Sequence, residues 1–460
     1  MPDSHLAVGK SLQRIDGVDK VTGSAKYAAD IKLENMLHAR LLRSPHAHAK
    51  VKRIDTSAAQ KLTGVRAFAT ILEVPKVIEY WISLRTEEKK KQMFLRDNVV
   101  RFVGDPVLAV AADDQQTLDQ ALGLVNVEYE PLPALHDPLK AMAETGVKIH
   151  SRGNVAFKAN KVYGDIHAGF NHADIIIENT YRTSKQKHAA LEPFGACVAH
   201  YQPNGKLTVY SSTQLPHWSR HYLAGALELP LNRVRVIKPY TGGSFGGRCG
   251  LIHGLEVMCA WLSRRTGRPV RMAFSREEDF MATETRHPMT IRMKTGATGD
   301  GIITANAVEI ISDVGGYGTH YIGVIADCLS TGVGLYKIPN YSFSATAVFT
   351  NKSLCGALRG YGNPQMNFAQ ESQMDIIAEK LRMDPLELRL KNYRKLGEID
   401  PVLNEEIRSN GLKECLEKGA KSSGWQKKRR LKPVKGPRKR GIGLSVMMHG
   451  TGAGKALPDP

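Results

Sequence analysis

Two glycine-rich turns hold the residues best suited to chemistry in this sequence: Thr241–Gly250 (TGGSFGGRCG) and Ala357–Gly362 (ALRGYG). Glycine permits positive φ and a close approach of backbone to ligand. Where such a turn joins a strand to a helix, its N–H groups can bind an anion. Arg248 and Arg359 add one guanidinium to each turn, which suits oxyanions or phosphate. The turns therefore indicate an anion site, although spacing alone is equally typical of tight structural connections.

Other common chemistries find no support in the motifs. The first turn lacks the G-x-G-x-x-G spacing and is not followed by G-K-[ST], so neither a Rossmann site nor a P-loop is indicated. The six cysteines are scattered, with no C-x-x-C pair. This argues against a disulfide framework, a zinc site or an iron–sulfur cluster within the chain.

The elements around the turns follow from hydrophobic periodicity. Residues 234–240 and 343–349 alternate as strands do, and helical patterns follow at 251–262 and 376–381. Short β-like runs and helices over the first 140 residues predict a compact α+β unit. Proline and glycine then punctuate the chain, which places a boundary between about 138 and 160. We expect units at 1–145 and 146–426, a basic linker at 427–440 and a new strand at 441–448.

Composition limits the class of protein. The chain has 460 residues, a net charge of +19 and 42% hydrophobic residues. No apolar stretch of about 18 residues and no export-signal pattern occurs, which favours a cytoplasmic protein without a membrane span. The basic run 427–440 contains two prolines and no aromatic residue, so a solvated linker is favoured over a nucleic-acid site.

Several segments, in this order, resemble the molybdenum-binding subunit of the xanthine dehydrogenase (molybdenum hydroxylase) family. The segments are RIDGVDKVTGSAKYAAD (14–30), LRSPHAHAK (42–50), GDPVLAV (104–110), HAALEP (188–193), STQ (212–214), GGSFGG (242–247) and LRGYG (358–362). The resemblance implies an α+β fold. An N-terminal α/β hammerhead domain, 1–145, would precede the first half of a molybdenum-cofactor-binding domain, 146–426.

The resemblance also implies the cofactor and its contacts. In that family the metal is held by the dithiolene of a pterin, here expected as the cytosine dinucleotide form, without a protein ligand. Gln214 would hydrogen-bond an oxo ligand, because an amide donates without titrating. Phe245 and Gly246 would present backbone, and Arg359 would lie beside the centre. The implied cofactor-binding set is Gln214, Gly243, Phe245, Gly246, Gly247, Arg359 and Gly360. For each residue a purely structural role is the alternative.

Three implied substrate-pocket positions depart from the purine-oxidising members. Cys249 stands where those members have a substrate-binding glutamate, and Asp327 where they have an arginine. Tyr361 replaces a phenylalanine that packs on the substrate ring. Loss of both polar contacts makes xanthine an unfavourable substrate. The pattern is closer to the 4-hydroxybenzoyl-CoA reductase-like and nicotinate dehydrogenase-like branches.

The resulting hypothesis is an oxidoreductase subunit that hydroxylates, or reductively dehydroxylates, an aromatic or N-heteroaromatic substrate at a molybdenum centre with oxo and sulfido ligands. The alternatives are a non-catalytic scaffold or assembly homologue, a carbon monoxide or aldehyde dehydrogenase-like member, and a basic nucleic-acid-binding protein. Molybdenum and pterin content separates the hypothesis from the scaffold and nucleic-acid readings.

The sequence contains no iron–sulfur or flavin motif, so 2Fe–2S clusters and FAD are expected on partner subunits. The family's second half supplies a further cofactor loop and a general-base glutamate. Neither has room after Gly441. We therefore expect no catalytic residue in this chain, a second molybdenum-domain subunit that carries the glutamate, and an active site formed between chains.

Overall fold

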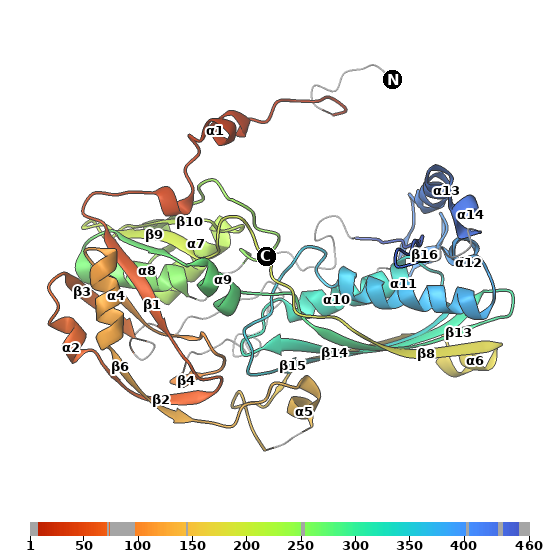
Figure 1. The fold of residues 1–460 in the computed structure, drawn as a ribbon, viewed down its shortest axis with the longest axis horizontal. Coiled ribbons are helices and arrows are strands. Elements are labelled where there is room, and N and C mark those ends of the chain that lie inside the picture. Colours follow the sequence, from red (N-terminus) through yellow and green to blue (C-terminus); the bar gives the residue numbers. More distant parts are fainter. Residues whose placement is uncertain are drawn as a thin grey trace.

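Two β-sheets organise the computed structural model, which describes residues 8–70, 73, 97–143, 146–249, 254–401, 404–430 and 436–449 (Figure 1). The larger sheet has seven strands in the order β11-β10-β9-β12-β1-β5-β3. Their bounds are β1 Leu37–Arg43, β3 Val65–Thr70, β5 Pro106–Ala112, β9 Ala196–Tyr201, β10 Leu207–Ser211, β11 Val234–Ile237 and β12 Val270–Ala273. β1 and β12 pair in parallel, with Leu37 opposite Val270. The sheet therefore contains strands from both sides of the domain boundary that was expected near residue 145. That boundary stays a proposal.

Strand β5 shows why this sheet is stable. It is buried along its whole length, and alternate residues point to opposite faces. Leu108 packs in a cluster with α4 (Gln115–Leu124), whereas Ala109 packs in the cluster that contains α8 (Leu255–Thr266). A strand covered on both faces needs a continuous apolar run, as residues 106–112 provide.

The second sheet has five strands in the order β7-β15-β14-β13-β8. Their bounds are β7 Val155–Tyr163, β8 Ile175–Arg182, β13 Met289–Ala297, β14 Ile303–Gly315 and β15 Asn340–Phe349. Helices α10 (Tyr321–Gly334) and α11 (Asn363–Lys380) lie along one face of this sheet (Figure 1). Ile310 packs in their cluster, while its neighbour Ile311 packs in a cluster with α5 (Pro138–Met142) on the other face.

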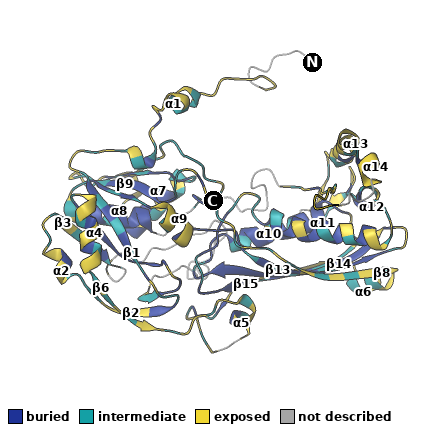
Figure 2. Ribbon diagram, viewed as in Figure 1, coloured by how far each residue is buried: buried dark blue, intermediate teal, exposed yellow. Residues whose placement is uncertain are grey.

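Several further elements accompany the two large sheets. A three-stranded sheet has the order β4-β2-β6. The bounds are β2 Ala49–Asp55, β4 Val99–Val100, β6 Asn126–Pro131, β16 Ile399–Asp400, β17 Glu405–Glu406, α1 Gly17–Thr22, α2 Ser57–Gln60, α6 Ile166–Asn171, α7 Pro216–Ala226, α9 Arg276–Ala282, α12 Pro385–Asn392, α13 Leu412–Ser423 and α14 Trp425–Arg429. Figure 2 shows that β14 and α8 are mostly buried, whereas the edge strand β8 and the helices α1, α13 and α14 have few buried residues or none. Within the described ranges, no helix is long and apolar enough to cross a membrane.

The predicted α+β class is confirmed. The strands predicted before the first and second turns are also confirmed, and they are β11 and β15. Helix α8 begins at Leu255, and residues 251–253 of its predicted start lie outside the described residues. The basic run does not begin as a linker, because its first three residues complete α14, where Arg429 stacks 5.3 Å from the ring of Trp425. Residues 431–435 of the run lie outside the described part.

The strand predicted at 441–448 is wrong for the described chain. This segment instead lies extended over α10 and α11, and the N–H of Val446 donates to the carboxylate of Glu371 at 2.8 Å. Leu444 and Met448 pack with Val446 against the helical cluster. The alternating apolar pattern therefore reflects burial against helices rather than pairing with a neighbouring strand.

Candidate functional site

The two glycine turns are in direct backbone contact, although they lie far apart in the sequence. The N–H of Arg359 donates to the carbonyl oxygen of Phe245 at 2.8 Å. A Cβ atom on Gly246 would lie 2.8 Å from the carbonyl oxygen of Ala357, so a side chain there would separate the turns. The structure thus joins the two predicted turns into one site.

Each turn holds an aromatic residue in the left-handed backbone region. Phe245 has φ 52° and Tyr361 has φ 47°. This conformation costs a bulky residue about 1–3 kcal/mol, and such strain concentrates at ligand sites. The side chain of Phe245 is 45% exposed, so it does not fill a core. The strain has no packing explanation at Phe245, which favours a ligand-facing role.

Gln214 fastens the first turn through one side of its amide. It follows strand β10, and its Oε1 atom accepts hydrogen bonds from the hydroxyl of Ser244, from Gly246 N at 3.1 Å and from Arg248 N at 3.4 Å. Three converging donors fix which amide atom is the oxygen. The amide NH₂ makes no hydrogen bond to any described residue. It is therefore available to donate to a ligand.

Arg248 does not serve the anion site that the sequence suggested. Its side chain is fully buried and ion-paired with Glu192 at 3.1 Å. The guanidinium also donates to the carbonyl oxygens of Glu192 and Gly243, at 2.8 and 3.0 Å, and lies 4.6 Å from the ring of Phe194. All its donors are used to hold the turn. The prediction of an oxyanion role for Arg248 is wrong.

Arg359 is the opposite case. Its side chain is exposed and makes no hydrogen bond or ion pair with any residue that the structure describes. The turn itself is held from behind, because Arg286 donates to the carbonyl oxygen of Arg359 at 2.8 Å. A fixed backbone with a free guanidinium is suited to an anionic ligand.

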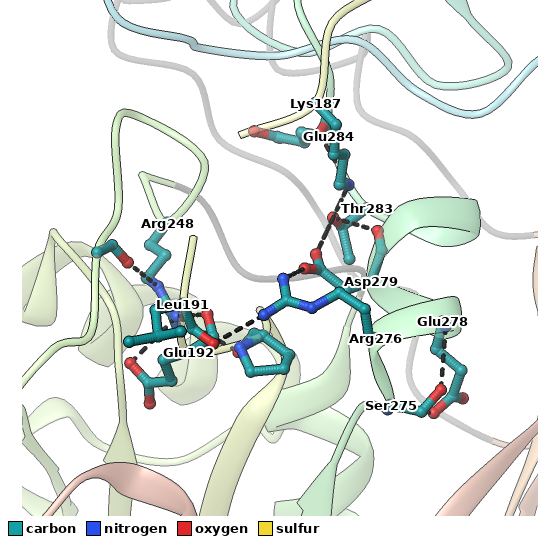
Figure 3. A network of polar contacts seen from close by, with 12 residues as sticks. Lys187, Leu191, Glu192, Arg248, Ser275, Arg276, Glu278, Asp279, Thr283 and Glu284 are labelled. Carbon is teal, nitrogen blue, oxygen red and sulfur yellow. Dashed lines mark hydrogen bonds and ion pairs between the residues drawn. The ribbon is translucent and has the colours of Figure 1, made fainter. Parts of the chain in front are cut away.

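A polar network joins helix α9 to the segment beneath the first turn (Figure 3). Arg276 connects the carboxylate of Asp279, at 3.0 Å, to the carbonyl oxygen of Leu191, at 2.7 Å. Lys187 hydrogen-bonds Thr283 and lies 3.7 Å from Asp279. Burial lowers the pKa of Lys187 to about 8. The segment that carries Lys187 and Leu191 packs directly beneath the first turn, so the network fixes its position.

One of the proposed pocket residues, Asp327, lies on α10 (Tyr321–Gly334). A Cβ on Gly323 would meet the hydroxyl of Tyr361 at 2.7 Å, and Thr331 hydrogen-bonds Asn363 two turns later. Asp327 lies between them at helical spacing, so it shares their face. Burial raises the pKa of Tyr361, and the ionisable groups of Cys249 and Asp327 add to this shift, which indicates that the three side chains lie in one neighbourhood.

The ionisation of these residues is set by burial. Burial raises the pKa of Cys249 to about 12, so the thiol is neutral at physiological pH and is no substitute for a charged glutamate. Burial raises the pKa of Asp327 to about 6, and the charge of His449 opposes this shift. The hydroxyl of Tyr361 is 2.8 Å from Nδ1 of His320. The pocket therefore combines an aromatic ring with one ionisable carboxyl group.

Glu284 is a residue of this region that sequence reasoning missed. Its side chain is buried; Oε1 accepts from Thr319 at 2.7 Å, and Oε2 has no hydrogen-bond partner. Burial raises the pKa of Glu284 to about 7. A Cβ on Gly356 would lie 2.2 Å from Oε2, so this carboxyl group lies directly behind the second turn. The sequence offered no signal, because Glu284 lies outside both turns.

The expected cofactor-binding residues fall into two groups. Gln214, Phe245, Gly246 and Arg359 lie where the turns meet. Gly247 and Gly360 are explained by packing, because Cβ atoms there would lie 2.1 Å from Phe194 and 2.6 Å from Pro364. Gly243 has φ 100°, which glycine adopts readily. A free amide NH₂, a free guanidinium and exposed turn backbone fit a large anionic group such as a pterin cofactor. Within the described ranges, no cluster of three or more His, Cys, Asp or Glu could hold a metal ion directly.

Comparison with known families gives two matches. Residues 149–393 match the molybdopterin cofactor-binding domain family. Residues 22–133 match the aldehyde oxidase and xanthine dehydrogenase a/b hammerhead domain family.

Individual relatives agree with these matches. The nicotinate dehydrogenase large molybdopterin subunit of Eubacterium barkeri is 36% identical over 436 residues, which covers 93% of this chain and 100% of that protein. A xanthine dehydrogenase molybdenum-binding subunit of Escherichia coli is 35% identical over 443 residues, covering 95% of this chain and 58% of that protein. Against this second relative, the chain spans little more than half the length.

Solved structures have the same fold. Quinoline 2-oxidoreductase from Pseudomonas putida 86 matches with a TM-score of 0.84 and 27% identity, covering 92% of this chain and 55% of that chain. The aldehyde oxidoreductase from Desulfovibrio gigas matches with a TM-score of 0.82 and 28% identity, covering 91% of this chain and 47% of that chain.

Proposed function

Because this chain belongs to the xanthine dehydrogenase family of molybdenum-binding oxidoreductase subunits, we propose that it forms part of a site where an aromatic or N-heteroaromatic substrate is hydroxylated. The reverse reaction, reductive dehydroxylation, would use the same groups. The observation that carries the proposal is the junction of the two turns. At this junction lie the free NH₂ of Gln214 and the free guanidinium of Arg359. The same two turns hold Phe245 and Tyr361, both with a strained backbone.

The residues of this chain have distinct tasks in the proposal. The turn backbone and Arg359 would bind anionic parts of the pterin cofactor, and Gln214 would donate its amide N–H to an oxygen at the metal centre. Tyr361 would position the substrate ring. The bound molybdenum centre would supply the redox chemistry, in which conversion of C–H and water to C–OH releases two electrons and two protons. An iron–sulfur subunit would accept the electrons.

The substrate class is supported by the pocket and by the names of relatives. Cys249 is neutral, so the pocket lacks the glutamate charge that purine-oxidising members use. Two similar proteins are named for nicotinate and for quinoline, which are N-heteroaromatic compounds. A third, nicotine 6-hydroxylase large subunit of Paenarthrobacter nicotinovorans, is 29% identical. Together these favour a small N-heteroaromatic ring.

Partner subunits would complete the active site. We propose that a second molybdenum-domain subunit carries the general-base glutamate, and that further subunits carry 2Fe–2S clusters and FAD. The cofactor would be the cytosine dinucleotide form. The description of the Eubacterium barkeri relative as a large molybdopterin subunit is consistent with a complex of several chains.

The test is to purify the chain with its co-purifying proteins and to measure molybdenum and the released pterin. We expect one molybdenum per chain, a cytosine dinucleotide on mass spectrometry, and oxidation of an N-heteroaromatic such as nicotinate or quinoline with an artificial electron acceptor. A preparation without molybdenum or pterin would support the scaffold alternative instead. Salt-sensitive DNA binding would support the nucleic-acid alternative.

A further inference from the structure

The extended segment 441–449, which we call the strap, is held on the helices along one backbone edge. The N–H of Val446 donates to the carboxylate of Glu371 at 2.8 Å, and the carbonyl oxygen of Met448 accepts from Nδ2 of Asn363 at 3.0 Å. Glu371 and Asn363 both belong to α11. Because the N–H and C=O groups of every second residue in an extended chain point to the same side, one edge of the strap faces α11.

The groups that hold this edge are themselves fixed. Glu371 also accepts from Arg389 at 2.9 Å and from the hydroxyl of Tyr336 at 2.5 Å, and all three residues are buried. Gly334 of α10 leaves room for the side chain of Met448, because a Cβ atom there would lie 2.0 Å from its Cε. The strap is therefore a docked element with a defined register.

The opposite edge of the strap is open. In the same alternation, Ser445 and Met447 direct their N–H and C=O groups away from α11. No residue in the described part of the chain hydrogen-bonds these four groups, and Met447 is 60% exposed. Residues 441–448 contain neither proline nor a charged residue, which are the usual protections of a strand edge. Such an edge is a template for the addition of another strand.

We infer that the open edge of the strap pairs, as one β-strand with another, with an extended strand of the second molybdenum-domain subunit. This inference rests on the proposed function and identifies where that subunit binds. Asn363, which holds the end of the strap, directly follows the second glycine turn. A strand added to the strap would therefore bring the partner subunit beside the turn that carries Arg359 and Tyr361. The proposed general-base glutamate is needed at that place.

Two observations favour this partner over a second copy of the chain. A net charge of +19 opposes close association of two copies. The xanthine dehydrogenase relative of Escherichia coli matches 95% of this chain with only 58% of its own length, so it has further sequence outside the match. The proposed second subunit would be the counterpart of that further sequence.

Hydrogen exchange in the purified complex tests the pairing directly. The tagged chain is expressed with its neighbouring genes, and exchange is resolved by mass spectrometry at single amides. We expect the N–H groups of Ser445 and Met447 to exchange at least about a hundredfold more slowly than in an unstructured chain, as that of Val446 does. Protection of Val446 alone, with fast exchange at Ser445 and Met447, would overturn the inference.

A matched pair of variants separates the backbone donor from the side chain. S445P removes one N–H from the open edge in a conformation that proline tolerates, whereas S445A keeps this N–H. S445P should retain at least about tenfold less of the second subunit on the tagged chain, because it loses a hydrogen bond and its ring obstructs the added strand. S445A should retain as much as the wild type. Equal retention by the two variants would count against the pairing.

Cross-linking identifies the partner. A photo-reactive group placed at Met447 should join the chain to the second molybdenum-domain subunit. Cross-links only to a second copy of the chain, or only within the chain, would refute this choice of partner.

The outcomes separate this inference from the proposed function. If the complex contains molybdenum and pterin and oxidises an N-heteroaromatic compound, while Ser445 and Met447 exchange freely, then the pairing fails and the proposed function stands. If both amides are protected and Met447 cross-links to the second subunit, but no ring compound is oxidised, then the proposed reaction fails and the pairing stands.

Discussion

At the scale of single residues, the two arginines of the glycine turns have opposite roles. Arg248 is buried with its donors satisfied, and Arg359 is exposed with a free guanidinium. Sequence reasoning treated them alike, because position in a turn does not reveal which way a side chain points. Burial separates a structural arginine from a ligand-facing one.

Arg359→Ala should lower turnover by about a hundredfold or more, since removal of one preorganised donor has effects of this size. The melting temperature should change little, because the exposed side chain makes no hydrogen bond or ion pair with any described residue. Arg382→Ala, an exposed arginine after α11, is the control. Full turnover together with full molybdenum content in Arg359→Ala would refute the assignment.

Gln214 can be tested on both sides of its amide. Gln214→Ala removes the oxygen that accepts hydrogen bonds from three donors of the first turn. It should lower the free energy of unfolding by about 1–3 kcal/mol. It should also lower the molybdenum content. Gln214→Glu keeps the acceptor and removes the NH₂. It should keep the melting temperature and lose turnover. Wild-type kinetics and metal content in both variants would contradict the proposed contact.

Glu284 should make stability depend on pH. Its pKa is about 7 in the folded chain, above the ordinary value of 4.5, so the folded state holds the proton more tightly than the unfolded state. Stability should therefore fall as pH rises from about 4.5 to about 7, by roughly 1.4 kcal/mol per pH unit at most. Glu284→Gln should abolish this slope and be more stable than wild type at pH 8.

Urea unfolding at pH 5 and pH 8 measures the Glu284 effect. Glu130→Gln, on the exposed face of β6, is the control and should keep the wild-type slope. An unchanged slope in Glu284→Gln would mean that Oε2 is solvated in solution.

At the scale of elements, the close approach of the two turns depends on Gly246. Gly246 has φ 104°, which disfavours any other residue. A Cβ atom there would also lie 2.8 Å from the carbonyl oxygen of Ala357. Gly246→Ala should lower both stability and molybdenum content. Gly153→Ala is a matched control, because Gly153 has φ 99° with no atom within 4 Å of a Cβ. Similar losses in both variants would mean that backbone strain alone, and not turn contact, is responsible.

Local patterns predicted the elements but not their partners. The strand that ends in Phe349 was found where periodicity placed it. The segment at 441–448 was misassigned, because alternation reports burial of every second residue without naming the covering surface. Gln214 was proposed through a family resemblance and stays a proposal, whereas Glu284 drew no attention in the sequence because tertiary contacts alone bring it behind the second turn.

At the scale of the whole molecule, the proposed electron path requires other subunits. The described part of the chain contains no cluster of metal-ligating residues, and the proposed reaction releases two electrons. We predict that an affinity-tagged chain, expressed with its neighbouring genes, co-purifies with a Cys-rich iron–sulfur protein and a second molybdenum-domain protein. Efficient reduction of an acceptor by this chain alone would contradict the prediction.

The parallel pairing of β1 with β12 has a consequence for how the chain is made. Leu37 and its partner Val270 are separated by 233 residues, so a ribosome that adds about 5–20 residues per second needs roughly 12–47 s to deliver the second strand. During this interval the growing chain has β1, β3 and β5 but an open edge at β1. An open edge invites pairing with other chains. Nascent chains should therefore depend on chaperones until β12 emerges, and slowing translation before residue 270 should increase aggregation.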